Sequence, residues 1–170
     1  LSLIEREVKD KEFTTHCAPL IRANDKSITE VYRIRFQDAE NRIEKLMASF
    51  NGQEVPGGLF GIGGIVRLPK FQKIQKEFGA PDLGFDLLAK NELENWIVEL
   101  KISQPNSSQI LFTANQAKMF REKSNLPNTK IWLVVMGTDK VQNRKFLNHN
   151  QILFSTEKDI SEIERLLEKQ

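Results

Sequence analysis

Two apolar segments joined by a short polar stretch constrain the fold of this chain more than any other feature. Phe85–Ala89 and Trp96–Ile102 have the composition of β-strands, and the residues between them have the composition of a turn. The pattern therefore predicts a β-hairpin. If Lys90 pairs with Asn95, the same register sets Asp86 opposite Glu99, with the two side chains on one face about 5 Å apart.

Carboxylates at that separation repel each other unless a cation lies between them, so this register predicts a metal site made by Asp86 and Glu99. Mg²⁺ prefers one or two protein carboxylates completed by water and phosphate oxygens, and the backbone carbonyl of Leu100 would be a third ligand. Lys101 shares a strand face with Glu99, where its charge would orient the attacking water and offset the charge of a phosphorane. The competing interpretation is a hairpin whose charged face is merely solvated.

Four segments have the periodicity of helices. A serine or threonine followed three residues later by Glu or Gln is a typical start, and proline is common in the first turn. The expected helices start at Ser27, after Pro69, at Thr113, and at Ser155 or Thr156. The first would end at Asn51-Gly52 and the third near Lys123. The glycine-rich segment Gly57–Gly64 is expected to be a mobile loop, and it lacks the ending of a phosphate-binding loop.

Two more strands are expected, a buried central one over Lys130–Met136 and a short one over Ile152–Phe154. Together these elements predict an α/β domain with a mixed central sheet flanked by helices. A length of 170 residues suits one domain, which we expect over residues 27–170, with residues 1–26 as a peripheral arm or helix.

The amino-acid composition limits the kinds of metal site and catalytic group that the chain can form. One cysteine and two histidines are too few for a structural zinc site and exclude an intrachain disulfide, so carboxylates, lysine and a hard metal ion remain. Residues 77–100 hold six acids and one lysine, whereas residues 101–156 hold eight bases and two acids. An acidic pocket between basic flanks suits a metal-dependent enzyme that acts on phosphodiesters. The lone cysteine fits a reducing compartment, and there is no apolar run of about 18 residues, so we expect a cytoplasmic protein without a membrane span.

Around the hairpin the sequence resembles the PD-(D/E)xK nuclease superfamily. The matching string is Pro81–Asp86 followed by Glu99-Leu100-Lys101. Downstream, Ile110–Ala117 and Ile131–Val135 are similar to the strand, helix and strand after this motif in nuclease-like domains appended to bacterial helicases and defence proteins, and in Mrr-type restriction enzymes. The resemblance covers residues 38–137. It implies a restriction-endonuclease-like, three-layer fold and Mg²⁺-assisted hydrolysis of DNA phosphodiesters, with Mn²⁺ as a substitute.

The resemblance also implies roles for the hairpin residues. Asp86 and Glu99 would bind the metal, and Lys101 would be the catalytic lysine. Asp82 competes with Asp86 for the first position, and Asp86 is favoured because it opens the strand in register.

Two further site residues are implied by the resemblance alone. Members of the superfamily often add an acid from the first core helix, which indicates Glu40, or alternatively Glu44, four residues later. Some members carry a glutamine near the scissile phosphate on the helix after the lysine strand, which indicates Gln116. The two glutamates are explained equally well as ordinary charged residues on the exposed side of a helix, and Gln116 is explained equally well as part of a helix cap.

Basic side chains on two segments are expected to contact the DNA backbone. The expected contacts are Arg67, Lys70 and Lys73 after the glycine loop, and Lys118, Arg121 and Lys123 on the third helix, with Arg144 and Lys145 beyond it. The runner-up function is a non-cleaving DNA-binding or assembly domain, and a third is a protein-interaction domain of a larger machine. A homodimer or further domains are expected partners, since the chain begins with Leu1 rather than Met.

Overall fold

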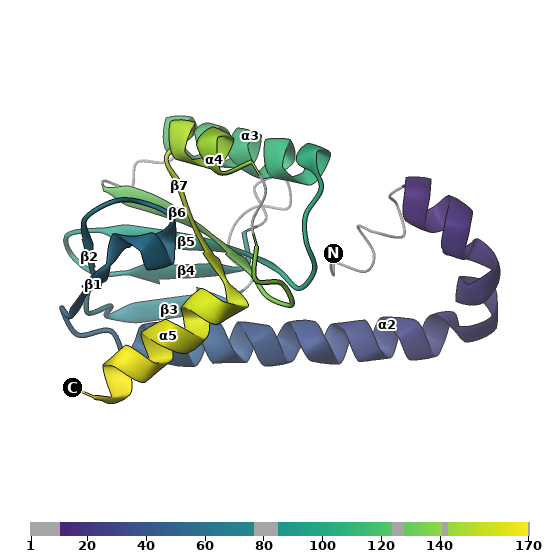
Figure 1. Cartoon of the computed structure of the whole chain (residues 1–170), viewed down its shortest axis with the longest axis horizontal. Coiled ribbons are helices and arrows are strands. Elements are labelled where there is room, and N and C mark those ends of the chain that lie inside the picture. Colours follow the sequence, from purple (N-terminus) through teal and green to yellow (C-terminus); the bar gives the residue numbers. More distant parts are fainter. Residues whose placement is uncertain (1–10, 77–84, 124–127, 141–142, 170) are drawn as a thin grey trace. The chain divides into compact units, whose positions relative to one another are not determined.

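The computed structural model describes residues 11–76, 85–123, 128–140 and 143–169 (Figure 1). The chain divides into two compact units between Asn41 and Arg42, and each unit is described by itself. The first unit contains most of helix α2, which runs from Lys11 to Ala48. The second unit contains the end of α2 and all later elements.

Helix α2 does not start at Ser27, so the expected capping box is wrong. The Glu30 side chain instead accepts a hydrogen bond of 2.5 Å from Arg33, one turn further along the helix. Residues 20–51 contain no glycine or proline. Extending an existing helix costs less free energy than nucleating a new one, so the helix continues through the serine.

A five-stranded mixed sheet forms the centre of the second unit, in the order β3-β4-β5-β6-β7. The three strands β3, β4 and β5 pair antiparallel, whereas β5, β6 and β7 pair parallel. The bounds are Lys73–Lys76 for β3, Leu87–Lys90 for β4, Asn95–Lys101 for β5, Thr129–Val135 for β6 and Ile152–Thr156 for β7. The expected α/β class with a mixed sheet is confirmed, and so is the buried strand before Met136, which is β6.

The predicted hairpin is present as β4 and β5. Lys90 pairs with Asn95 and Leu87 pairs with Val98, so the expected register holds along the whole ladder. Polar turn residues fix this register: the Asn91 side chain accepts hydrogen bonds from the backbone N–H groups of Leu93 and Glu94.

The helix expected after Pro69 is wrong, because residues 73–76 form strand β3 beside β4. Phe71 does pack inward, with its ring centroid 6.0 Å from that of Trp96. The backbone groups along the edge of β4 need hydrogen-bond partners, and a helix of two turns is marginal by itself, so pairing overrides the local pattern.

The glycine-rich segment folds into a closed turn. Strands β1 (Glu54–Pro56) and β2 (Ile65–Arg67) pair antiparallel around the short 3₁₀ helix η1 (Gly57–Phe60). The Gly57 N–H donates to the Gly64 carbonyl at 2.7 Å, and a Cβ on Gly57 would lie 2.6 Å from the Gly63 carbonyl oxygen. Phe60 is fully buried, with its ring centroid 5.0 Å from that of Trp132. The segment is therefore part of the core packing.

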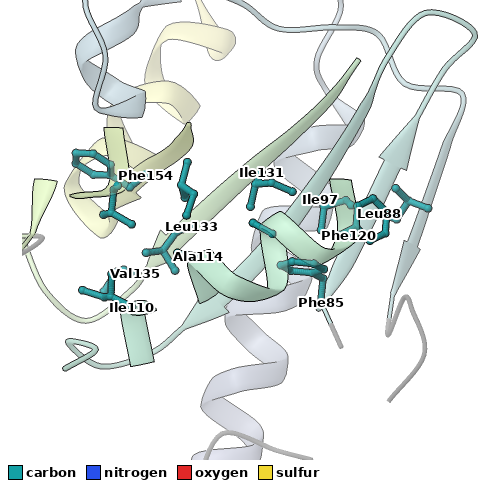
Figure 2. Packing of buried hydrophobic residues seen from close by; sticks show 13 residues of the cluster. Phe85, Leu88, Ile97, Ile110, Ala114, Phe120, Ile131, Leu133, Val135 and Phe154 are labelled. Carbon is teal, nitrogen blue, oxygen red and sulfur yellow. The ribbon is translucent and has the colours of Figure 1, made fainter. Parts of the chain in front are cut away.

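Helices cover both faces of the sheet. Helices α3 (Ser107–Lys123) and α4 (Arg144–His149) lie over one face, and α5 (Glu157–Glu168) lies over the other (Figure 1). Figure 2 shows the apolar cluster beneath α3, in which Phe120 lies by Phe85 and Ala114 lies by Leu133. Of the two expected starts of the last helix, Ser155 and Thr156, the structure has Thr156, which forms a capping box with Asp159 at the start of α5. None of the described helices combines the length and apolar character that a membrane span requires.

Candidate active site

Strand β5 carries Glu99 and Lys101 on one face, and both side chains are buried. Glu99 is 0% exposed and Lys101 is 3% exposed. Ile97, at the next alternate position on that face, belongs to the apolar cluster beneath α3 (Figure 2). The charged face of the hairpin is therefore not solvated, and the competing interpretation of these residues is wrong.

Asp86 lies at the point where the ladder between β4 and β5 ends. Its backbone N–H donates to the carbonyl oxygen of Val98 at 2.9 Å, and its Oδ2 accepts a hydrogen bond from the backbone N–H of Leu100 at 2.7 Å. Asp86 thus contacts the residues immediately before and after Glu99. The Asp86–Glu99 pair predicted from the register is not part of the ladder, which ends at Leu87 and Val98. The Asp86 side chain is instead bonded to the backbone of β5 at Leu100.

The carbonyl of Leu100 points toward this same region. Lys101 accepts a hydrogen bond from the Met136 N–H at 2.7 Å on the β6 side. Backbone groups alternate between the two edges of a strand, so the polar groups of Leu100 lie on the β4 edge, where its N–H meets Asp86. The expected third ligand is thus on the side of Asp86.

The donor set fits a hard divalent cation. Asp86 and Glu99 supply carboxylate oxygens, and Leu100 supplies a carbonyl oxygen, all of which suit Mg²⁺. In the part of the chain that the structure describes, no group of three or more His, Cys, Asp or Glu side chains could hold a metal ion. Two carboxylates completed by water and substrate oxygens would be a usual kind of Mg²⁺ site.

Gln116 lies on the side of α3 that faces the sheet. It is 5% exposed, and its Oε1 has no hydrogen-bond partner among the described residues. Thr113, one turn earlier on the same face, is also buried, and its hydroxyl donates to the Gln109 carbonyl within the helix. The sequence pattern predicts only a helix start at Thr113, not a buried position. The three-residue spacing of Thr113 from Gln116 was the signal that both belong to the buried face.

The capping role considered for Gln116 is wrong, because α3 starts before Thr113. Asn106 is the cap: its side chain accepts from the Gln109 N–H at 2.8 Å, while the Gln109 side chain accepts from the Asn106 N–H at 2.9 Å. Residues 110–112, expected as a strand, lie inside this helix. A buried amide in mid-helix therefore needs another explanation.

The other expected acids are placed differently. Glu40 lies on α2 in the first unit, which is described apart from this site. Glu44 belongs to the second unit and forms a salt bridge of 3.5 Å with Lys76. Asp82, the competitor of Asp86, lies outside the described residues.

The basic residues expected to contact DNA after the glycine-rich segment do not share a helix, because the helix expected after Pro69 is not formed. Arg67 ends β2, Lys70 lies in the following loop, and Lys73 begins β3. Residues three apart on a strand point to opposite sides, so Lys73 and Lys76 do not share a face. Their contact with DNA remains a prediction, without the helical geometry on which it was based.

The basic residues of α3 lie near its C-terminal end. Lys118 and Lys123 are exposed, whereas Arg121 is half-buried and donates to the carbonyl oxygens of Asn150 and Gln151. Two surface hollows border Arg121, and neither is lined by Asp86, Glu99, Lys101 or Gln116.

Comparison with known proteins assigns no role to these residues. No protein-family model matches the chain, and neither a curated protein nor a solved structure matches it.

Proposed function

We propose that this chain is a Mg²⁺-dependent DNA endonuclease with a restriction-endonuclease-like fold. The observation that carries the proposal is the burial of Glu99 and Lys101 on one strand face, with Asp86 held beside them by its bond to Leu100. Removing a charge from water costs several kcal/mol per ion, and apolar residues would pack a central strand at lower cost. A catalytic role therefore explains the burial of these two charged side chains better than a contribution to the stability of the fold does.

Each residue has a definite role in phosphodiester hydrolysis. Asp86, Glu99 and the Leu100 carbonyl would hold the metal ion, which supplies a polarised water and charge neutralisation when bound. Lys101 places an ammonium group two residues from Glu99 on the same face, where it favours the deprotonated water and stabilises the negative charge that develops around phosphorus. The Gln116 amide would orient the water or a phosphate oxygen.

The solvent exposure of these residues indicates the side from which a DNA phosphate would enter the site. Glu99 and Lys101 are buried, whereas Asp86 is half-buried. A phosphate would therefore reach the group from the side of Asp86, at the start of β4.

The test is cleavage of supercoiled plasmid DNA by the whole chain in Mg²⁺, with an EDTA arm. We expect nicked or linear product in Mg²⁺ and none in EDTA or with Glu99→Gln. Glu92→Gln is the matched control, because Glu92 is an exposed residue of the turn in the same hairpin and should not affect the rate. DNA binding without cleavage in either Mg²⁺ or Mn²⁺ would favour a non-cleaving DNA-binding domain instead.

A further inference from the structure

A basic groove between α3 and α4 lies outside the candidate active site. One hollow of this groove is lined by Lys118, Arg121 and His149, with Glu122 as the acidic residue in its lining. A second hollow is also lined by Arg121 and the amide of Asn148, together with Lys130, whose Nζ lies 3.9 Å from a carboxylate oxygen of Glu94. Cations and amides are the groups that bind phosphate oxygens, so the groove has the chemistry of an anion site.

Arg121 is held in place at the junction of the two hollows. Its Nη1 donates to the Asn150 carbonyl at 2.9 Å and its Nη2 donates to the Gln151 carbonyl at 2.7 Å. A guanidinium has five N–H donors, so three have no partner among the residues that the structure describes. Burial lowers the pKa of Arg121, although an arginine stays charged at neutral pH. A cation that is already fixed loses little side-chain entropy when an anion binds.

Helix α4, whose Asn148 and His149 line the two hollows, carries further positive charge at its N-terminal end. Arg144 and Lys145 are exposed, and neither forms a salt bridge within the described part of the chain. The sequence from residue 140 to residue 151 contains no Asp or Glu. Elsewhere, by contrast, Arg42 and Arg165 are paired with carboxylates. The charge of α4 is therefore not compensated locally.

The groove lies over the same face of the sheet as the candidate active site. Apolar residues of α3 and α4, including Ala117, Phe120 and Leu147, join one cluster with Ile97 of β5. Glu99 and Lys101 follow Ile97 on that face of β5. A long polyanion in the groove would therefore be on the face of the sheet that carries the proposed chemistry.

We propose that the groove between α3 and α4 binds the sugar–phosphate backbone of duplex DNA, with Arg121 as a fixed anchor and Lys118 as a second contact in its lining. Arg144, whose guanidinium lies over the Phe154 ring, and Lys145 would be further contacts from the exposed side of α4. The inference rests on the proposed function in that DNA is the ligand. Contacts to phosphates carry no base information, so binding at this surface is independent of sequence.

The experiment measures the affinity of the whole chain for a fluorescent DNA duplex over a series of salt concentrations in EDTA, where cleavage is blocked. The test variant is the triple Lys118→Gln, Arg144→Gln, Lys145→Gln. The control is the triple Lys45→Gln, Lys158→Gln, Lys169→Gln, which removes the same amount of charge. Lys45 and Lys158 are exposed on α2 and α5, and Lys169 is exposed directly after α5. We expect the test triple to weaken binding by at least about tenfold and to lower the salt slope by about three, because each phosphate contact contributes about 0.9.

Equal effects of the two triples, or no DNA binding by the wild-type chain, would overturn the inference. Plasmid cleavage measured in parallel separates this result from the proposed function. Weaker binding by the test triple, with no cleavage by the wild-type chain, would support the groove and reject the nuclease. Cleavage by the wild-type chain together with unchanged binding by the test triple would support the nuclease and reject the groove.

Discussion

The backbone N–H of Leu100 donates a 2.7 Å hydrogen bond to Oδ2 of Asp86, so the start of β4 is attached to β5 next to Glu99. The bond has two consequences. It holds the carboxylate of Asp86 close to the backbone around Glu99, and it leaves the Leu100 carbonyl on the same edge. The predictions below follow from this arrangement and from the burial around it.

Replacing Asp86 should separate its structural role from its proposed chemical role. Asp86→Asn retains an oxygen acceptor for the Leu100 N–H, so we expect a folded protein that does not cleave DNA. Asp86→Ala loses the acceptor and should lower the free energy of unfolding by about 1.5–3 kcal/mol, the usual contribution of a hydrogen bond to a charged group. Urea unfolding and plasmid cleavage measure the two effects. Asp139→Asn, at an exposed position, is the control, and full cleavage by Asp86→Asn would contradict the role as metal ligand.

Lys101 should be tested with methionine rather than alanine. Lys101 is 3% exposed, so its side chain is part of the packing around β5. Lys101→Ala would leave a cavity and lower stability, whereas Lys101→Met keeps the length of the side chain. We expect Lys101→Met to fold with a lower melting temperature, because the buried Glu99 carboxylate loses the ammonium group beside it, and to cleave at least about 100-fold more slowly. A wild-type rate in a folded Lys101→Met protein would remove lysine from the mechanism.

The metal site predicts a specific pattern of ligands. A crystal soaked in Mn²⁺ should show an ion bound by Asp86, Glu99 and the carbonyl oxygen of Leu100, and Glu99→Gln should remove it. Water and substrate oxygens complete the coordination, so the affinity without DNA should be modest. An ion bound elsewhere, or carboxylate oxygens that diverge from each other in the crystal, would reject the site.

Gln116 offers a test in which stability and activity change in opposite directions. Its Oε1 is buried without a hydrogen-bond partner among the described residues, which costs about 1–3 kcal/mol. Gln116→Met has a similar volume without the polar amide, so it should raise the free energy of unfolding by about 1 kcal/mol and slow cleavage. Asn115→Leu, on the exposed side of the same helix, is the control. If Gln116→Met were less stable and equally active, Gln116 would be only a packing residue.

Local patterns in the sequence predicted the elements that carry the proposed chemistry. The turn at Asn91 and the apolar strands set the register of Lys90 with Asn95, and the alternation of a strand put Glu99 and Lys101 on one face. The start of α5 at Thr156 was equally predictable, because a capping box uses only neighbouring residues. These features depend on contacts that are close in the sequence, so the residues themselves specify them.

Contacts between distant segments decided the rest. Residues 73–76 are a strand because the edge of β4 needs a partner, and Phe60 is in the core because Trp132 lies beside it. Most importantly, no local pattern showed that α3 covers the face of β5 that carries Glu99 and Lys101. Whether a side chain is buried depends on how the sheet and helices pack together. The local sequence around a charged residue is the same whether water or a helix covers that residue. Only the tertiary structure turned a charged strand face into a buried one, which is why these residues suggest chemistry rather than solvation.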